Sequence, residues 1–141
     1  MPFISIQEAL EKKKDQVKIH GWVYRERKQK DLVFLIIRDH SNIIQTVVKK
    51  ENVSEKEWDD VNKILVESSI ELEGEIKEDK RAVTGYEVQV KKINVVGFAD
   101  VFPIKKDQSE ELLLDNRHLW LRSRKLTAIL KVRSTVFGAI H

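Results

Sequence analysis

The 141-residue sequence predicts a mainly β fold, with a five-stranded barrel, a helix between its third and fourth strands, a short N-terminal helix, and a C-terminal hinge plus helix. Three observations support this fold. Five segments either are rich in β-branched and aromatic residues or alternate apolar with polar residues, as strands do. Ser-x-x-Glu capping boxes at Ser5 and Ser54 mark helix starts outside those segments. Apolar residues then recur at steps of three and four from Leu126 to Ile140, the period of an amphipathic helix.

The segments occur in a definite order. The expected strands cover residues 17–25, 32–37, 43–49, 70–77 and 86–96. A helix from about Ser5 to Lys14 precedes them, and residues 25–31 form a charged hairpin loop. Gly21 marks the position where the first strand is expected to bulge or bend, and the Lys91–Lys92 pair indicates a register shift in the fifth. Three strands, a helix and two strands is the order of an OB barrel, whose open face binds single-stranded nucleic acid.

Composition restricts the class of protein. Apolar residues make up 41% and charged residues 35%, as in soluble globular proteins, and no apolar run approaches the ~20 residues that cross a bilayer. The absence of cysteine excludes disulfides, thiolate zinc sites and cysteine nucleophiles, and four scattered histidines make a poor metal site. The N-terminus lacks the long apolar centre of a signal peptide. We therefore expect a cytoplasmic protein, and its net charge of +3 gives a mild bias toward polyanions.

Phe34 is the first candidate for contact with a base. The two-residue period of its strand places Val33, Leu35 and Ile37 on one face and Phe34 on the other. An exposed aromatic ring stacks on a base, which contributes ~1 to 3 kcal/mol. Because Ile36 shares the face of Phe34, a position in the core is equally compatible with the pattern.

Two polar residues inside expected strands are further candidates. The amide of Gln45 can donate and accept, as recognition of a uracil edge requires, although a glutamine in such a strand is more commonly solvated. Glu87 would suit RNA only by accepting from a base amino or imino group. The outward glutamates Glu71, Glu73 and Glu75 show that a solvated role suits Glu87 as well.

A cluster of basic residues lies in the expected first hairpin. Arg25, Arg27, Lys28 and Lys30 fall within six positions, and the only acidic residues in this loop are Glu26 and Asp31. Any one of them could simply be solvated at a hairpin tip. As a group they favour phosphate contact.

The segments GWVYRERK, VFLIIRD, IIQTVVKK and GYEVQVKKINVV, followed by LLLDNRHLWLRSRK, resemble the N-terminal domain and hinge of class IIb aminoacyl-tRNA synthetases. The resemblance covers nearly the whole chain. HLWLRS is more similar to the asparagine enzymes than to the aspartate enzymes, which tend to carry an acidic residue where Trp120 stands. The resemblance implies an anticodon-binding OB domain over residues 1–103, a hinge over 104–124, and the start of a truncated catalytic domain over 125–141.

The same resemblance implies roles for individual residues. Phe34 would stack on a central anticodon uridine, Gln45 would hydrogen-bond its edge, Arg27 would contact the stem-loop backbone, and Glu87 would contact a flanking base. No catalytic residue and no metal or other cofactor is expected in this piece. The full-length enzyme would use ATP and magnesium to attach asparagine to its tRNA, and would form a homodimer through the catalytic domain. The alternatives are an aspartyl-tRNA or nondiscriminating synthetase, or a free-standing OB protein that binds single strands.

Overall fold

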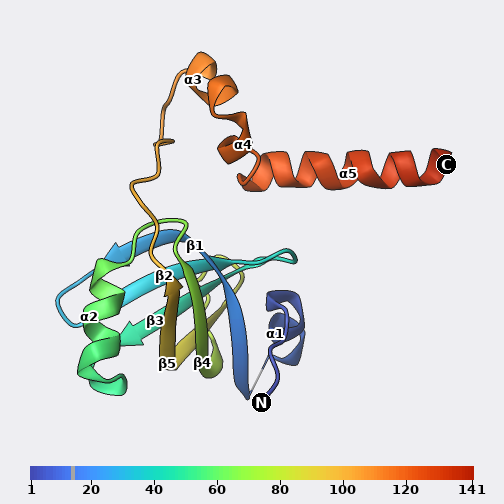
Figure 1. The fold of residues 1–141 in the computed structure, drawn as a ribbon. Helices are drawn as coiled ribbons and strands as arrows, with labels where there is room; N and C mark the ends of the chain where they lie inside the picture. Colours follow the sequence, from blue (N-terminus) through green and yellow to red (C-terminus); the bar gives the residue numbers. More distant parts are fainter. Residues whose placement is uncertain (14) are drawn as a thin grey trace. The chain divides into compact units, whose positions relative to one another are not determined.

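The computed structural model describes residues 1–13 and 15–141, which separate into two compact units, Met1–Phe102 and Pro103–His141 (Figure 1). The first unit is a closed barrel with strands in the order β1-β2-β3-β5-β4, so the predicted OB barrel is confirmed. Its strands are β1 (Gln16–Lys28), β2 (Leu32–Arg38), β3 (Ile43–Lys49), β4 (Ser69–Glu78) and β5 (Tyr86–Gly97).

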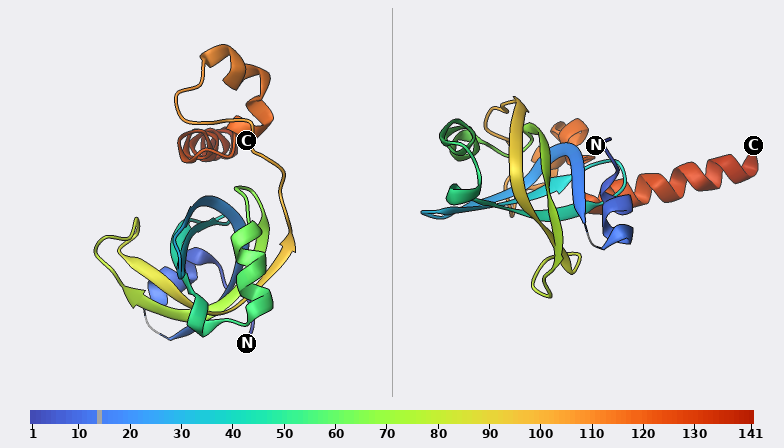
Figure 2. Two further views of the ribbon diagram at one scale, coloured as in Figure 1. Left: turned by 90° about the vertical axis from the view of Figure 1, so that its left-hand side faces the viewer. Right: turned by 90° about the horizontal axis from the view of Figure 1, so that it is seen from below.

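Strand β1 closes the barrel by pairing with two partners. Its N-terminal half pairs antiparallel with β4, and its C-terminal half pairs antiparallel with β2. Strands β3 and β5 pair in parallel, with Gln45 opposite Glu87 and Val47 opposite Gln89. The two views of Figure 2 show the strands curving around a common interior. The parallel pair matters for function because it brings polar side chains from distant parts of the sequence onto one face.

Side chains alternate between the interior and the outer face. On β2, Val33, Leu35 and Ile37 are fully buried, whereas Phe34 and Ile36 are only half-buried. The two-residue period therefore predicted the inward set of this strand correctly. The predicted register shift at Lys91–Lys92 is also confirmed, because residue 92 pairs with residue 73 of β4 while residue 90 pairs with residue 74.

Strand β1 is longer than the sequence indicates. It continues to Lys28, so residues 25–28, expected in the hairpin loop, are part of the strand. Its bulge lies between Val23 and Arg25 rather than at Gly21. Gly21 instead permits close approach of two strands, because a Cβ there would collide with the backbone oxygen of Arg38.

The bulge decides which basic residues face outward. Arg25 pairs with Ile36 and Arg27 with Phe34, both on the outer face, whereas Lys28 pairs with the buried Val33. One extra residue in a strand shifts every following side chain to the opposite face. Only part of the basic cluster therefore lies on the face of Phe34.

Both capping boxes form, and the helices that they open pack on opposite sides of the barrel (Figures 1 and 2). Helix α1 spans Ile6–Lys12 and helix α2 spans Glu55–Lys63. A 3-10 turn, η1 (Lys50–Asn52), follows β3. The predicted end of the first helix, Lys14, lies outside the described residues. The two helices contribute Ile6, Ala9, Trp58 and Val61 to the hydrophobic core.

Asp39, in the turn between β2 and β3, holds the start of α1. One of its carboxylate oxygens accepts from the Ile6 amide at 2.8 Å, and the other accepts from the Ser41 amide and hydroxyl at 2.7 and 2.6 Å. Burial alone would raise the pKa of Asp39, but hydrogen bonds from Ser41, Ile6 and Asn42 hold it below its ordinary value. The ionised carboxylate therefore joins the turn to the helix.

The second unit begins with an irregular segment, residues 103–109, and continues as helices. Residues 104–124, expected to be a polar hinge, contain α3 (Glu110–Asp115) and α4 (Arg117–Trp120), while α5 (Arg124–Ile140) is the predicted amphipathic helix. Ser109 caps α3 by accepting from the Leu112 amide, a signal already present in the sequence. Within the described part of the chain, no helix has the length and apolar character needed to cross a membrane.

Candidate nucleic-acid interface

Phe34 and Arg27 form a stacked pair on the outer face of the barrel. The two residues are opposite one another in the register of β1 and β2, and the guanidinium carbon of Arg27 lies 4.6 Å from the centroid of the Phe34 ring. A cation at this distance from a ring face is attracted by the ring quadrupole. Phe34 is half-buried and lies outside the core cluster. The structure thus decides against the core position that the sequence pattern left open.

A polar network lies beside this pair. Gln45 is opposite Ile36, the residue two positions along β2 from Phe34, so Gln45 and Phe34 are diagonal neighbours on one face. The amide nitrogen of Gln45 donates to Oε2 of Glu87 at 3.0 Å. The amide nitrogen of Gln89 donates to Oε1 of the same carboxylate at 2.6 Å. Aromatic, amide and carboxylate groups from β2, β3 and β5 therefore adjoin one another.

Glu87 differs from the other glutamates of the strands. Its exposure is only 9%, whereas Glu71, Glu73 and Glu75 are half-buried. Both of its oxygens accept hydrogen bonds from glutamine amides. The solvated outward role considered for Glu87 from the sequence does not match this environment.

Three of the four basic candidates have exposed side chains for which no ion pair is formed among the described residues. Arg25 and Arg27 are exposed on β1, and Lys30 is exposed in the turn that follows it. The guanidinium carbon of Arg25 lies 5.5 Å from the ring centroid of Tyr24. These cations lie at one edge of the face that carries Phe34, where they are placed to contact a phosphate backbone.

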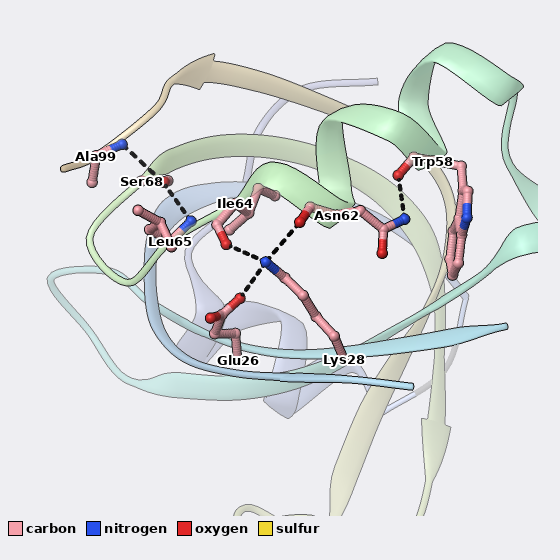
Figure 3. Close-up of polar contacts among 8 residues, drawn as sticks. All are labelled: Glu26, Lys28, Trp58, Asn62, Ile64, Leu65, Ser68 and Ala99. Atoms are coloured by element: carbon pink, nitrogen blue, oxygen red, sulfur yellow. Dashed lines mark hydrogen bonds and ion pairs between the residues drawn. The ribbon is translucent and has the colours of Figure 1, made fainter. Parts of the chain in front are cut away.

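Lys28 has a different environment, which Figure 3 shows. Its ammonium group donates to the backbone oxygens of Asn62 at 2.8 Å and Ile64 at 2.7 Å, and lies 2.9 Å from Oε2 of Glu26. The last carbonyls of a helix lack intrahelical partners and carry the negative end of its dipole, so a cation there is stabilising. Three partners match the three hydrogens of an ammonium group. The structure therefore assigns Lys28 to the end of α2 instead of the predicted phosphate contact.

Gln89 is the residue that sequence reasoning missed. Its alternation with Val88 and Val90 indicated only that it faces outward. Its link to Glu87 and Gln45 depends on the parallel pairing of β3 with β5, which no local pattern reveals. Among residues 1–13 and 15–141, no group of three or more His, Asp or Glu side chains is placed to hold a metal ion.

Relatives of the chain share both this barrel and the segments that build it. Residues 17–96 match the OB-fold nucleic acid binding domain of the tRNA anticodon family. The asparagine–tRNA ligase of Thermoplasma acidophilum is 50% identical over 122 residues, which cover 86% of this chain and 28% of that protein. The asparagine–tRNA ligase of Thermococcus kodakarensis is 47% identical, over 88% of this chain and 28% of that protein. The chain thus spans less than a third of the length of these curated relatives.

Solved structures agree with the sequence comparison. Asparaginyl-tRNA synthetase from Pyrococcus horikoshii, complexed with asparaginyl-adenylate, matches 99% of this chain and 33% of its own with a TM-score of 0.86 and 39% identity. Aspartyl-tRNA synthetase from Entamoeba histolytica, at 23% identity and a TM-score of 0.82, shares the fold. The chain therefore belongs to the OB-fold nucleic acid binding domains of the tRNA anticodon family, and it matches about a third of the length of asparaginyl-tRNA synthetases.

Proposed function

We propose that this chain binds the anticodon stem-loop of an asparagine-type tRNA, as the anticodon-binding part of an asparagine–tRNA ligase. The observation that carries the proposal is the placement of a half-buried aromatic ring, Phe34, beside the hydrogen-bonding side chain of Gln45 on one outer face. Unpaired bases bind proteins by stacking on aromatic or guanidinium planes and by hydrogen bonds at their edges. Both kinds of group adjoin here.

In this proposal the central uridine of the anticodon stacks on Phe34, whose ring also lies beside the guanidinium of Arg27. Gln45 hydrogen-bonds the edge of that base, because its amide both donates and accepts. Arg25 and Lys30 contact phosphates, and Arg27 contacts the backbone of the stem-loop. All three side chains are exposed. Glu87 lies next to Gln45 within the same site.

The longer protein would attach asparagine to the tRNA with ATP and magnesium, act in the cytoplasm, and form a homodimer through its catalytic domain. The support is the 50% identity to an asparagine–tRNA ligase of which this chain spans 28%. We assign no catalytic residue, ATP site or magnesium site to residues of this chain.

Direct binding tests the proposal. The purified chain is titrated with an asparagine-type anticodon stem-loop, the same loop with cytidine at the central position, and an unstructured oligonucleotide of equal length. We expect preference for the uridine-centred loop. Equal affinity for all three RNAs would instead identify a general single-strand-binding OB protein.

A second measurement separates binding from catalysis. Incubated with ATP, magnesium and asparagine, the chain should form no aminoacyl-adenylate, and adenylate formation would contradict the assignment of binding alone. Stem-loops that differ at the third anticodon base separate an asparagine enzyme from an aspartyl or nondiscriminating one, whose treatment of that base differs.

A further inference from the structure

Glu87 connects two glutamines of the outer face. Its two carboxylate oxygens accept from the amide nitrogens of Gln45, at 3.0 Å, and Gln89, at 2.6 Å. On the basis of the proposed function, we propose that Glu87 is a positioning residue, which fixes the orientation of the Gln45 amide and thereby makes it selective for uracil over cytosine. In this role Glu87 acts through Gln45 and does not itself contact the base.

The chemistry of the pair fixes the orientation of the amide. An ionised carboxylate only accepts hydrogen bonds, so only the NH₂ end of a glutamine amide can face it. Rotating the Gln45 amide by half a turn would bring its oxygen against an oxygen of Glu87. The parallel register places Gln45 and Glu87 directly opposite one another, and Glu87 is 9% exposed, which limits compensation by water. One of the two amide orientations is therefore strongly favoured.

The other end of the amide is free for a ligand. The oxygen of Gln45 has no hydrogen-bond partner within the described parts of the chain, and it is not among the buried unpaired polar atoms there. It is consequently accessible. In this fixed orientation, the Gln45 amide offers a base two groups on the face of Phe34: its oxygen as an acceptor, and the second hydrogen of its nitrogen as a donor.

This fixed pattern distinguishes two bases that have almost the same shape. Uracil carries a hydrogen on N3 and an acceptor oxygen on C4, whereas cytosine has an acceptor N3 and a donor amino group on C4. An amide in one orientation matches only one of these patterns, and the flipped amide matches the other. A glutamine that flips freely would therefore bind either base. Glu87 removes that freedom, and the mismatched base leaves polar groups unpaired.

The proposal differs from a direct contact of Glu87 with a flanking base. Both carboxylate oxygens already accept from protein amides in the unbound chain. A direct contact predicts that replacing Glu87 alters the preference at a flanking anticodon position. Orientation of Gln45 predicts that the preference changes at the central position alone.

The test is a competition between uridine-centred and cytidine-centred anticodon stem-loops for the same preparation of the 141-residue chain. The ratio of the two affinities is unaffected by the fraction of folded protein, so partial destabilisation does not confuse the result. We expect Glu87→Gln, which keeps the shape but can donate or accept, to reduce the preference for uridine roughly three- to tenfold, the value of about one hydrogen bond. Affinity for the cytidine loop should hold or rise, because a negative charge is lost.

Two controls make the result specific. Glu71→Gln removes the same charge from the outer face of β4, where Glu71 pairs in register with His20 and Asn94, and it should keep the wild-type preference. In the Gln45→Leu background, Glu87→Gln should change the preference no further, because the amide that it orients is absent.

The possible outcomes distinguish the orienting role of Glu87 from the proposed function. A wild-type preference that survives Glu87→Gln, or a loss that persists in the Gln45→Leu background, overturns the orienting role while the proposed function stands. A wild-type chain with no preference for the uridine-centred loop overturns the proposed function itself.

Discussion

The guanidinium carbon of Arg27 lies over the Phe34 ring, 4.6 Å from its centroid, so a cation and an aromatic ring are paired on the outside of the barrel. The two residues come from neighbouring strands and are opposite in register. Arginine at the edge of the site can follow the phosphate backbone while its carbon chain and charge keep the ring in place. The pair thus joins stacking and charge in one element.

Phe34→Ala should weaken binding of the anticodon stem-loop by ~1 to 3 kcal/mol, whichever base is central, because every base has a face that stacks. Equilibrium binding with uridine- and cytidine-centred loops measures this loss. Thermal unfolding is the control, since loss of a packed core phenylalanine costs ~3 to 5 kcal/mol of stability. A large fall in melting temperature with unchanged affinity per folded molecule would place the ring in the core instead.

Gln45→Ala should produce a loss that depends on the base. Removing the amide deletes hydrogen bonds to the uracil edge, so binding of the uridine-centred loop should fall by ~0.5 to 1.5 kcal/mol per hydrogen bond. Binding of the cytidine-centred loop should hardly change. If the variant keeps the wild-type preference for central uridine, Gln45 is not the residue that contacts this base.

Salt dependence should separate Lys28 from its basic neighbours. Neutralising a lysine or arginine that contacts phosphate lowers the slope of log affinity against log salt by about 0.7 to 0.9. We expect this decrease for Arg25→Met and Lys30→Met, which replace exposed cations. Lys28→Met should leave the slope unchanged, because its ammonium group is bound to the end of α2.

Lys28→Met should instead lower the stability of the fold. The change removes the donor to the oxygens of Asn62 and Ile64, and it leaves the buried Oε2 of Glu26 without its ion pair. Because Lys28 is partly exposed, we expect a loss of about 1 to 3 kcal/mol in the free energy of unfolding. Denaturant unfolding measures it, with Lys30→Met as the matched control. A lower salt slope without a loss of stability would restore Lys28 to the phosphate contacts.

Asp39 should make stability depend on acid. Because hydrogen bonds hold its pKa below the ordinary value in the folded chain, its contribution is complete above the unfolded pKa of about 4, and it is lost as pH falls through the lowered folded pKa. Asp39→Asn should lower the melting temperature at pH 7 and flatten its decrease in acid. Glu11→Gln, on the exposed side of α1, is the control. An equally steep acid dependence in Asp39→Asn would assign the effect to other carboxylates.

Local patterns were sufficient for most elements of the fold. Apolar runs located β2 and β3, and the capping boxes at Ser5 and Ser54 located the starts of α1 and α2. These features depend on neighbours a few positions apart, so a single sequence contains them. The predicted end of β1 was wrong. Pairing with β2 extends this strand through charged residues that were expected to form a loop.

For the candidate site, local patterns were enough to identify the available residue types and to predict that Phe34 faces away from Val33 and Leu35. The tertiary structure decided how they are used. Lys28 and Lys30 are two positions apart, yet Lys28 donates to the end of α2 and Lys30 lies in the turn after β1, because the bulge in β1 and the position of α2 set the surroundings of each. Likewise, only the parallel pairing of β3 with β5 brings Glu87 against Gln45, 42 positions away. Hydrogen bonds act over about 3 Å, so contacts between residues that are distant in sequence are settled by the packed fold.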